Sequence, residues 1–176
     1  MSSNKNKEYP ENGIYTEFYS NGNKKFESNF KNDLKEGPSI WWYEDGQIMA
    51  KHNYKKGNQW GRQRDWYENG QIEGDAMLKN TNIFDDIWDG YFCSWCENGQ
   101  KRKEGMYKNN VLHGKWNDWH ENGQMWHDGL YEDGEKDGKW TLWGEDGQVE
   151  SITFWEKGLV IKKDRWDENG EKVLKV

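Results

Sequence analysis

Aromatic and polar positions recur along this chain with a fixed period of about 24 residues. A turn tetrapeptide that reads S-N-G-N, E-D-G-Q, E-N-G-Q or E-N-G-E appears seven times, with its glycines at spacings of 24, 24, 29, 24, 24 and 23 residues. An aromatic residue precedes each of these glycines by four positions, and another follows five of them by eight positions. Such a period is the signature of a repeat array. The turn glycines are Gly22, Gly46, Gly70, Gly99, Gly123, Gly147 and Gly170, and the preceding aromatic residues, expected to be structural, are Phe18, Trp42, Trp66, Trp95, Trp119, Trp143 and Trp166.

One repeat unit predicts a β-hairpin. Residues 114–124 read G-K-W-N-D-W-H-E-N-G-Q, which is a short strand pattern that runs into an Asn-Gly pair. Asn-Gly favours a two-residue type I′ turn because both of its central residues need positive φ. The register that follows pairs Glu121 with Gln124, His120 with Met125, Trp116 with Gly129 and Gly114 with Tyr131.

This register places a large ring opposite a small residue in four of the six full repeats, which supports it because cross-strand pairs are the packing unit of a sheet. A second glycine lies nine residues before each of the first six turns. We expect it to lie beneath the aromatic residue that ends the second strand. The four pairs are Tyr15 with Ser28, Phe92 with Gly105, Trp116 with Gly129, and Trp140 with Thr153.

The predicted fold class is therefore all-β, an elongated single antiparallel sheet of about seven stacked hairpins. Residues 1–12 form a polar tail before a single array, residues 13–176. A low apolar content of 32% is sufficient for such an array, because each repeat buries its rings only against its neighbours. The predicted repeats span residues 13–36, 37–60, 61–89, 90–113, 114–137, 138–160 and 161–176.

The pattern resembles the MORN repeat family in its second, slightly longer variant. The matching features are G-K-W-x-x-W-x-E-N-G-Q from Gly114, the G-x-Y of residues 129–131, and the polar turn of residues 132–134. The resemblance implies a row of stacked hairpins. Bacterial members of this variant are commonly catalogued as YwqK-type antitoxins, so it also implies partner binding. Ile161 departs from the pattern, since it replaces the glycine that starts a repeat.

The charge balance favours a basic protein as the partner. The net charge is −7, and residues 61–89 and 114–137 each carry seven acidic residues against three and two basic ones. Such a chain disfavours nucleic acid and anionic membranes as partners. No apolar run approaches the ~20 residues of a membrane-spanning helix, and no signal peptide is visible, so we expect a cytoplasmic protein without a transmembrane segment.

The candidate partner-binding site combines an apolar loop with acidic residues. The third repeat is five residues longer than most, and the insertion falls within residues 80–89. An irregular loop with apolar side chains on a rigid scaffold is a good candidate for a contact site. The candidate residues are Ile83, Phe84, Asp85, Asp86, Ile87, Trp88, Asp89, Asp118, Asp128 and Asp133.

No catalytic site, metal site or cofactor is predicted. Cys93 and Cys96 form a lone C-x-x-C on a strand, where residues three apart point to opposite faces. Acidic residues precede the turns once per repeat, without the converging pair that a glycoside hydrolase needs. The histidines at 113, 120 and 127 have a ligand-like spacing but different expected positions in the hairpins.

We therefore expect a non-enzymatic, protein-binding scaffold, with an antitoxin-like neutraliser of a basic protein as the leading form. A module that binds carbohydrate or choline-type ligands with aromatic strips is the alternative. A membrane-associated scaffold is a weaker one.

Overall fold

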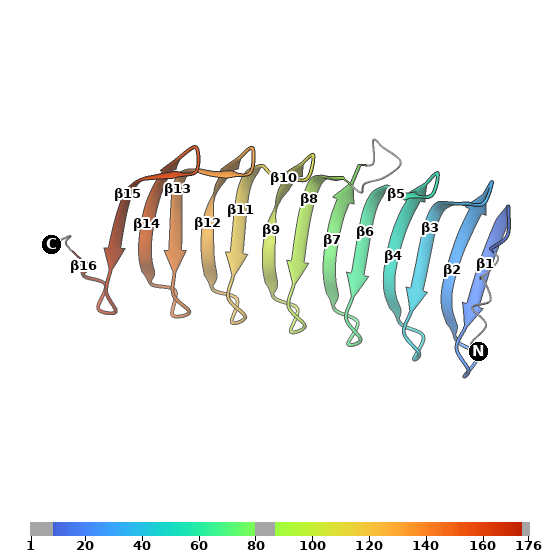
Figure 1. Ribbon diagram of the computed structural model, residues 1–176. Helices are drawn as coiled ribbons and strands as arrows, with labels where there is room; N and C mark the ends of the chain where they lie inside the picture. The colour runs from blue at the N-terminus through green and yellow to red at the C-terminus, as the bar shows by residue number, and fades with distance from the viewer. Residues whose placement is uncertain (1–8, 80–86, 174–176) are drawn as a thin grey trace, which may run out of the picture.

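The computed structural model describes residues 9–79 and 87–173, which form one long antiparallel sheet and contain no helix (Figure 1). The predicted all-β hairpin array is confirmed. Fourteen of the described strands follow one another across the sheet in chain order, while β5 pairs with β4 and β10 with β9. The strands are β1 (Gly13–Phe18), β2 (Lys24–Lys31), β3 (Leu34–Trp42), β4 (Ile48–Lys55), β5 (Asn58–Gln59), β6 (Gly61–Trp66), β7 (Ile72–Leu78), β8 (Trp88–Trp95), β9 (Lys101–Lys108), β10 (Val111–Leu112), β11 (Gly114–Trp119), β12 (Met125–Glu132), β13 (Glu135–Trp143), β14 (Val149–Glu156), β15 (Leu159–Trp166) and β16 (Lys172–Val173).

The hairpin tips differ from the predicted type I′ turns. The His120 N–H donates to the Gln124 carbonyl at 2.9 Å, and the Gly123 N–H donates to the His120 carbonyl at 2.9 Å, so the loop has three residues, 121–123. Only Gly123 has positive φ, at 85°. A turn that ends in a left-handed glycine is the usual three-residue hairpin. The predicted pairings of Glu121 with Gln124 and of His120 with Met125 are therefore wrong.

Type I′ geometry occurs instead at the connections between hairpins, along the opposite edge of the sheet (Figure 1). Five of these described connections are two-residue turns in which both residues have positive φ, between 48° and 86°. Such turns match the twist of the strands that they join. They consist of Asn32 and Asp33, Lys56 and Gly57, Asn109 and Asn110, Asp133 and Gly134, and Lys157 and Gly158.

Away from the tips, the predicted register is confirmed. Trp116 pairs with Gly129 and Gly114 pairs with Tyr131. The three other pairs of a ring with a small residue are also present. Paired residues share one face of a sheet, so the rings gather on one side, which we call the aromatic face. It carries Phe26, Phe92, Trp116, Tyr131 and Trp140.

The glycine that starts each repeat has a backbone role. All six such glycines have positive φ, between 63° and 124°. A Cβ on five of them, Gly114 included, would meet no atom within 4 Å, so space does not exclude a side chain at these five positions. Glycine is favoured there because other residues rarely adopt this conformation. Two glycines near the middle of second strands lie against rings, because a Cβ on Gly105 or Gly129 would overlap the ring of Trp116 or Trp140, respectively.

Trp116 and Trp140 are the most deeply buried tryptophans among the described residues, with 7% and 5% of their surface exposed. Each leans over the small residue of the preceding hairpin and joins two repeats. The indole N–H of Trp140 donates to the Leu130 carbonyl at 3.0 Å, which satisfies its polar atom. The tryptophans four residues before the turns, such as Trp119, are only half-buried, and Phe18 is 57% exposed.

We predict that Trp140→Ala lowers the free energy of unfolding by about 3–5 kcal/mol, as for other buried tryptophans. Trp119→Ala removes a half-buried ring and should cost about 1–2 kcal/mol. Urea unfolding followed by circular dichroism measures both. Equal losses for the two variants would show that the buried positions have been misassigned.

We also predict that Gly129→Ala destabilises the fold by about 1–3 kcal/mol, because the added methyl group overlaps the ring of Trp140. Gly74→Ala is the matched control. Its Cβ would lie 3.8 Å from Oδ2 of Asp65, an ordinary contact, and its φ is not positive. In thermal unfolding, the Gly74 variant should have nearly the same melting temperature as the parent. A Gly129 variant with that same melting temperature would contradict the contact between Gly129 and the ring of Trp140.

Candidate functional site

A ladder of hydrogen bonds joins neighbouring hairpin tips. Oδ1 of Asn122 accepts the N–H of Gln124 at 2.9 Å and fixes its own loop. Nδ2 of the same side chain donates to the Glu145 carbonyl of the next tip at 2.7 Å. Asn21, Asn69 and Asn98 make the same pair of contacts. The asparagine of the turn signal therefore acts through its side chain, as an Asx turn that also bridges two repeats.

A second ladder runs beside the first. The Tyr43 hydroxyl donates to the Trp66 carbonyl at 2.6 Å, and the same contact joins Tyr19 to Trp42 and Tyr67 to Trp95. His120 occupies the equivalent position in the fifth hairpin, with Nε2 3.0 Å from the carbonyl of Trp143. The tips are thus held at a spacing of two strands, roughly 10 Å.

The three-residue loops of the tips carry eight acidic residues and no lysine or arginine, and we call this row of loops the acidic tip edge. All eight side chains are exposed. Hydrogen bonds from the backbone and side chain of Gln47 lower the pKa of Asp45, so its carboxylate keeps its charge to a lower pH than an ordinary aspartate. The eight residues are Glu44, Asp45, Glu68, Glu97, Glu121, Glu145, Asp146 and Glu168.

The structure separates the three acidic candidates of the fifth repeat. Asp118 lies on the aromatic face, where its Oδ2 accepts the Trp116 indole N–H at 3.1 Å and lies 3.8 Å from Nδ1 of His127. Asp128 lies on the opposite face, since it pairs with Asn117. Asp133 lies in a connection turn and is 85% exposed. These three carboxylates therefore do not form one patch.

The loop candidates fall only partly within the described residues. Ile83, Phe84, Asp85 and Asp86 lie outside them. Ile87 and Asp89 are half-buried, and Trp88 begins β8 with 37% of its surface exposed. The Trp88 ring lies 5.6 Å from that of Phe92 and 5.4 Å from that of Tyr107 between centroids. Trp88 therefore packs at the edge of the aromatic core and also has a surface that a partner can reach.

The cysteines and histidines do not gather at one place. Cys93 is buried and Cys96 half-buried, both as free thiols, and burial raises the pKa of Cys93. Burial also lowers the pKa of His127. No group of three or more potential metal-ligating side chains is found within residues 9–79 and 87–173.

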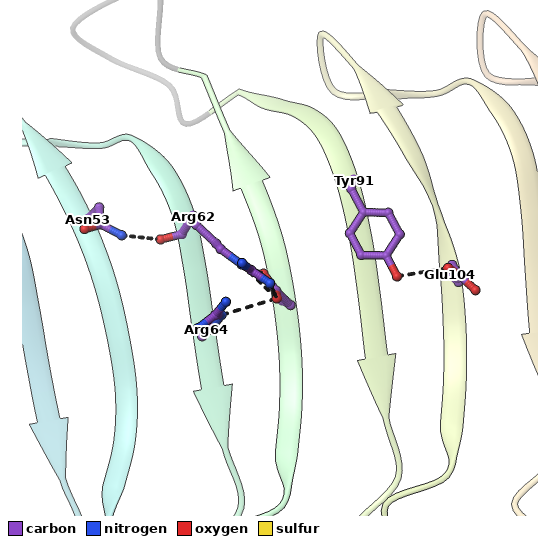
Figure 2. Close-up of polar contacts among 6 residues, drawn as sticks. Asn53, Arg62, Arg64, Tyr91 and Glu104 are labelled. Atoms are coloured by element: carbon purple, nitrogen blue, oxygen red, sulfur yellow. Dashed lines mark hydrogen bonds and ion pairs between the residues drawn. The ribbon is translucent and has the colours of Figure 1, made fainter.

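The face opposite the aromatic one carries paired charges at the centre of the array (Figure 2). The buried carboxylate of Asp75 accepts from Nε of Arg62 at 2.7 Å and from Nε of Arg64 at 3.3 Å. The Tyr91 hydroxyl donates to Oε1 of Glu104 at 2.9 Å, and burial is the main cause that raises the pKa of this phenol. These contacts join neighbouring strands and leave no pair of free carboxylates, so they have a structural role.

Two adjoining hollows lie at the third hairpin and share His52 and Asp65 in their walls, and we call them together the groove. Its part near the connections has a volume of about 180 Å³ and lies between Gln63, Ala76 and the rings of Trp88 and Phe92. Its part near the tips has a volume of about 380 Å³. His52 and Asp65 line both parts. The tip part is otherwise lined by Trp41, Tyr43, Met49, Ala50, Trp66 and Glu73.

We predict that Tyr43→Phe lowers the free energy of unfolding by about 0.5–1.5 kcal/mol, because it removes one hydrogen bond of the second ladder. Tyr15→Phe is the control, since the Tyr15 hydroxyl makes no hydrogen bond within the described residues. Chemical denaturation compares the two. Equal denaturation midpoints for the two variants would show that this hydrogen bond does not stabilise the fold.

The comparisons with known proteins support the repeat architecture. A family model described as a MORN repeat variant matches residues 11–32, 35–56, 61–80 and 112–133. These segments cover the first, second, third and fifth hairpins. No curated protein matches the chain. The described residues also include no helix long and apolar enough to cross a membrane.

Proposed function

The chain belongs to the MORN repeat family, and from this premise we propose that it is a protein-binding scaffold whose acidic tip edge recognises a basic partner protein. MORN repeats are generally non-catalytic modules that bind proteins or lipids. The acidic character of the tips favours a basic protein over an anionic membrane. Neutralisation of a basic toxin-like protein in the cytoplasm is the form of this function that we favour.

One observation carries the proposal, namely that eight exposed carboxylates lie along one edge with no basic residue in the same loops. The two ladders join the first six of these loops to one another, so little side-chain or loop ordering is needed when a partner binds there. Preorganisation of this kind increases affinity, because it lowers the entropy cost of association. Complementary charge also speeds encounter and directs it to one edge.

The alternative of a carbohydrate module has less support. A sugar-binding aromatic strip needs exposed flat faces, but Trp116 and Trp140 are at most 7% exposed and lie over glycines. Their rings therefore serve the core of the sheet. At the groove, the aromatic face presents the edges of rings to a ligand, and not the open flat ring surfaces on which a sugar stacks.

The proposal is tested with a peptide of six Lys-Ser-Ser units, in which an extended chain places lysines roughly 10 Å apart, like the tips. We predict that replacing Glu68, Glu97 and Glu121 by glutamine weakens binding about 10-fold at low salt and flattens its salt dependence, as three exposed charge pairs would. Isothermal titration calorimetry at several salt concentrations measures this.

The matched control replaces three exposed glutamates near the connections by glutamine, which changes the net charge equally. They are Glu132, Glu135 and Glu156. At about 0.1 M salt this control variant should bind the peptide within about 3-fold of the parent, since its charges lie a strand length from the tips and the Debye length is then about 10 Å. Equal losses in the two variants would mean that net charge, and not the acidic tip edge, attracts basic chains.

A further inference from the structure

The aromatic face is interrupted at the third hairpin. On one side, ring contacts run from Phe26 through Trp41 to His52, and on the other they run from Trp88 through Phe92 to Trp116. Between them stand residues that cannot continue the stack, because Gln63 occupies the position of a ring and Gly74 and Ala76 are small. The groove described above is the space that these three residues leave open.

The groove has acidic walls, and His52 is the only basic side chain among its lining residues. Oδ1 of Asp65 lies 2.9 Å from Nε2 of His52, while its Oδ2 lies over Gly74 toward the open space. The Asp65 side chain is 44% exposed. Glu73 lines the part near the tips, and no lysine or arginine is among the lining residues. Asp75 also borders the groove, but its carboxylate lies on the opposite face and pairs there with Arg62 and Arg64.

Aromatic edges beside an open carboxylate suit one kind of ligand. A guanidinium group is planar, pairs with a carboxylate through two hydrogen bonds and stacks on aromatic rings. Its aliphatic stem packs against apolar surface while the charged end meets the acid. Trp88, Phe92 and Leu78 supply the apolar walls, and Asp65 supplies the acid.

We infer that this groove receives an arginine side chain of the basic partner, with the guanidinium at Asp65 and the stem against Trp88 and Phe92. The inference rests on the proposed function, because it places one buried anchor beside a charged edge. Tyr43 and Trp66, at the base of two acidic tips, line the same groove. A bound chain can therefore lie along the tips and turn one arginine onto the aromatic face. A well-buried anchor governs dissociation, whereas exposed charges govern association.

The equivalent position in the fifth hairpin shows what closes such a groove. Asp118 corresponds to Asp65 in the repeat. There, the buried ring of Trp116 occupies the space that Gln63 leaves open, and its indole N–H donates to Asp118. Of these two hairpins, only the third has a carboxylate that faces an open space.

The test uses N-acetyl-arginine methylamide, a probe too small to span the tips, and follows the Gly74 amide and Trp88 indole signals by NMR. We expect saturable shifts at these two groups in the parent. Asp65→Asn should weaken binding at least 5-fold, and Gly74→Ala, whose methyl group narrows the groove, should weaken it similarly. Glu150→Gln is the control, since Glu150 occupies the strand position of Glu73 in the sixth hairpin; it should leave the affinity within 2-fold.

The outcomes separate this inference from the proposed function. Binding of the Lys-Ser-Ser peptide at the tips together with no arginine-probe shifts at Gly74 and Trp88 would overturn the groove and leave the scaffold function intact. Arginine binding that survives Asp65→Asn would overturn the assigned contact. Choline bound more tightly than the arginine probe would replace arginine by a quaternary ammonium ligand. A norleucine probe that binds as well as arginine would show that the charge plays no part.

Discussion

The structure depends on burying aromatic rings in a sheet whose described residues form a single layer. Trp140 has no opposing layer to pack against, so it lies over Gly129 of the preceding hairpin, and Trp116 lies over Gly105 in the same way. Each ring therefore buries its surface across the boundary between two repeats. Since an isolated hairpin is marginally stable, contacts of this kind between repeats stabilise the array, and a chain with 32% apolar residues can fold because each repeat buries its rings against its neighbours.

The tips extend the same principle to polar groups. Asn122 fixes its own loop through Oδ1 and the next loop through Nδ2, so one side chain defines both a turn and the spacing between turns. Because these bonds fix the spacing of the loops, the carboxylates of the acidic tip edge lie in a row at a regular separation. Stability and recognition are thus linked, because the contacts that join the repeats also space the charges that we propose as the binding surface.

The sequence predicted the repeat, the sheet and the pairing of Trp116 with Gly129, because period and residue size are visible in one chain. It misled on the turns, because asparagine before glycine favours both a type I′ turn and an Asx turn. The separation of Asp118 from Asp128 was implicit in the predicted register, which pairs Asp128 with Asn117 on the other face. The groove was not visible, since it arises where Gln63, Gly74 and Ala76 from two strands meet the rings of neighbouring repeats.

The central claim is that rings close the two boundaries of the fifth hairpin by lying over glycines. NMR of the folded chain tests it through the α protons of Gly105 and Gly129, which lie beneath the rings of Trp116 and Trp140. Ring currents should shift these protons strongly upfield, while those of Gly74, which has no ring over it, should resonate normally. If all three glycines had the same ordinary shifts, the rings would not lie over the backbone, and the account of this fold would be wrong.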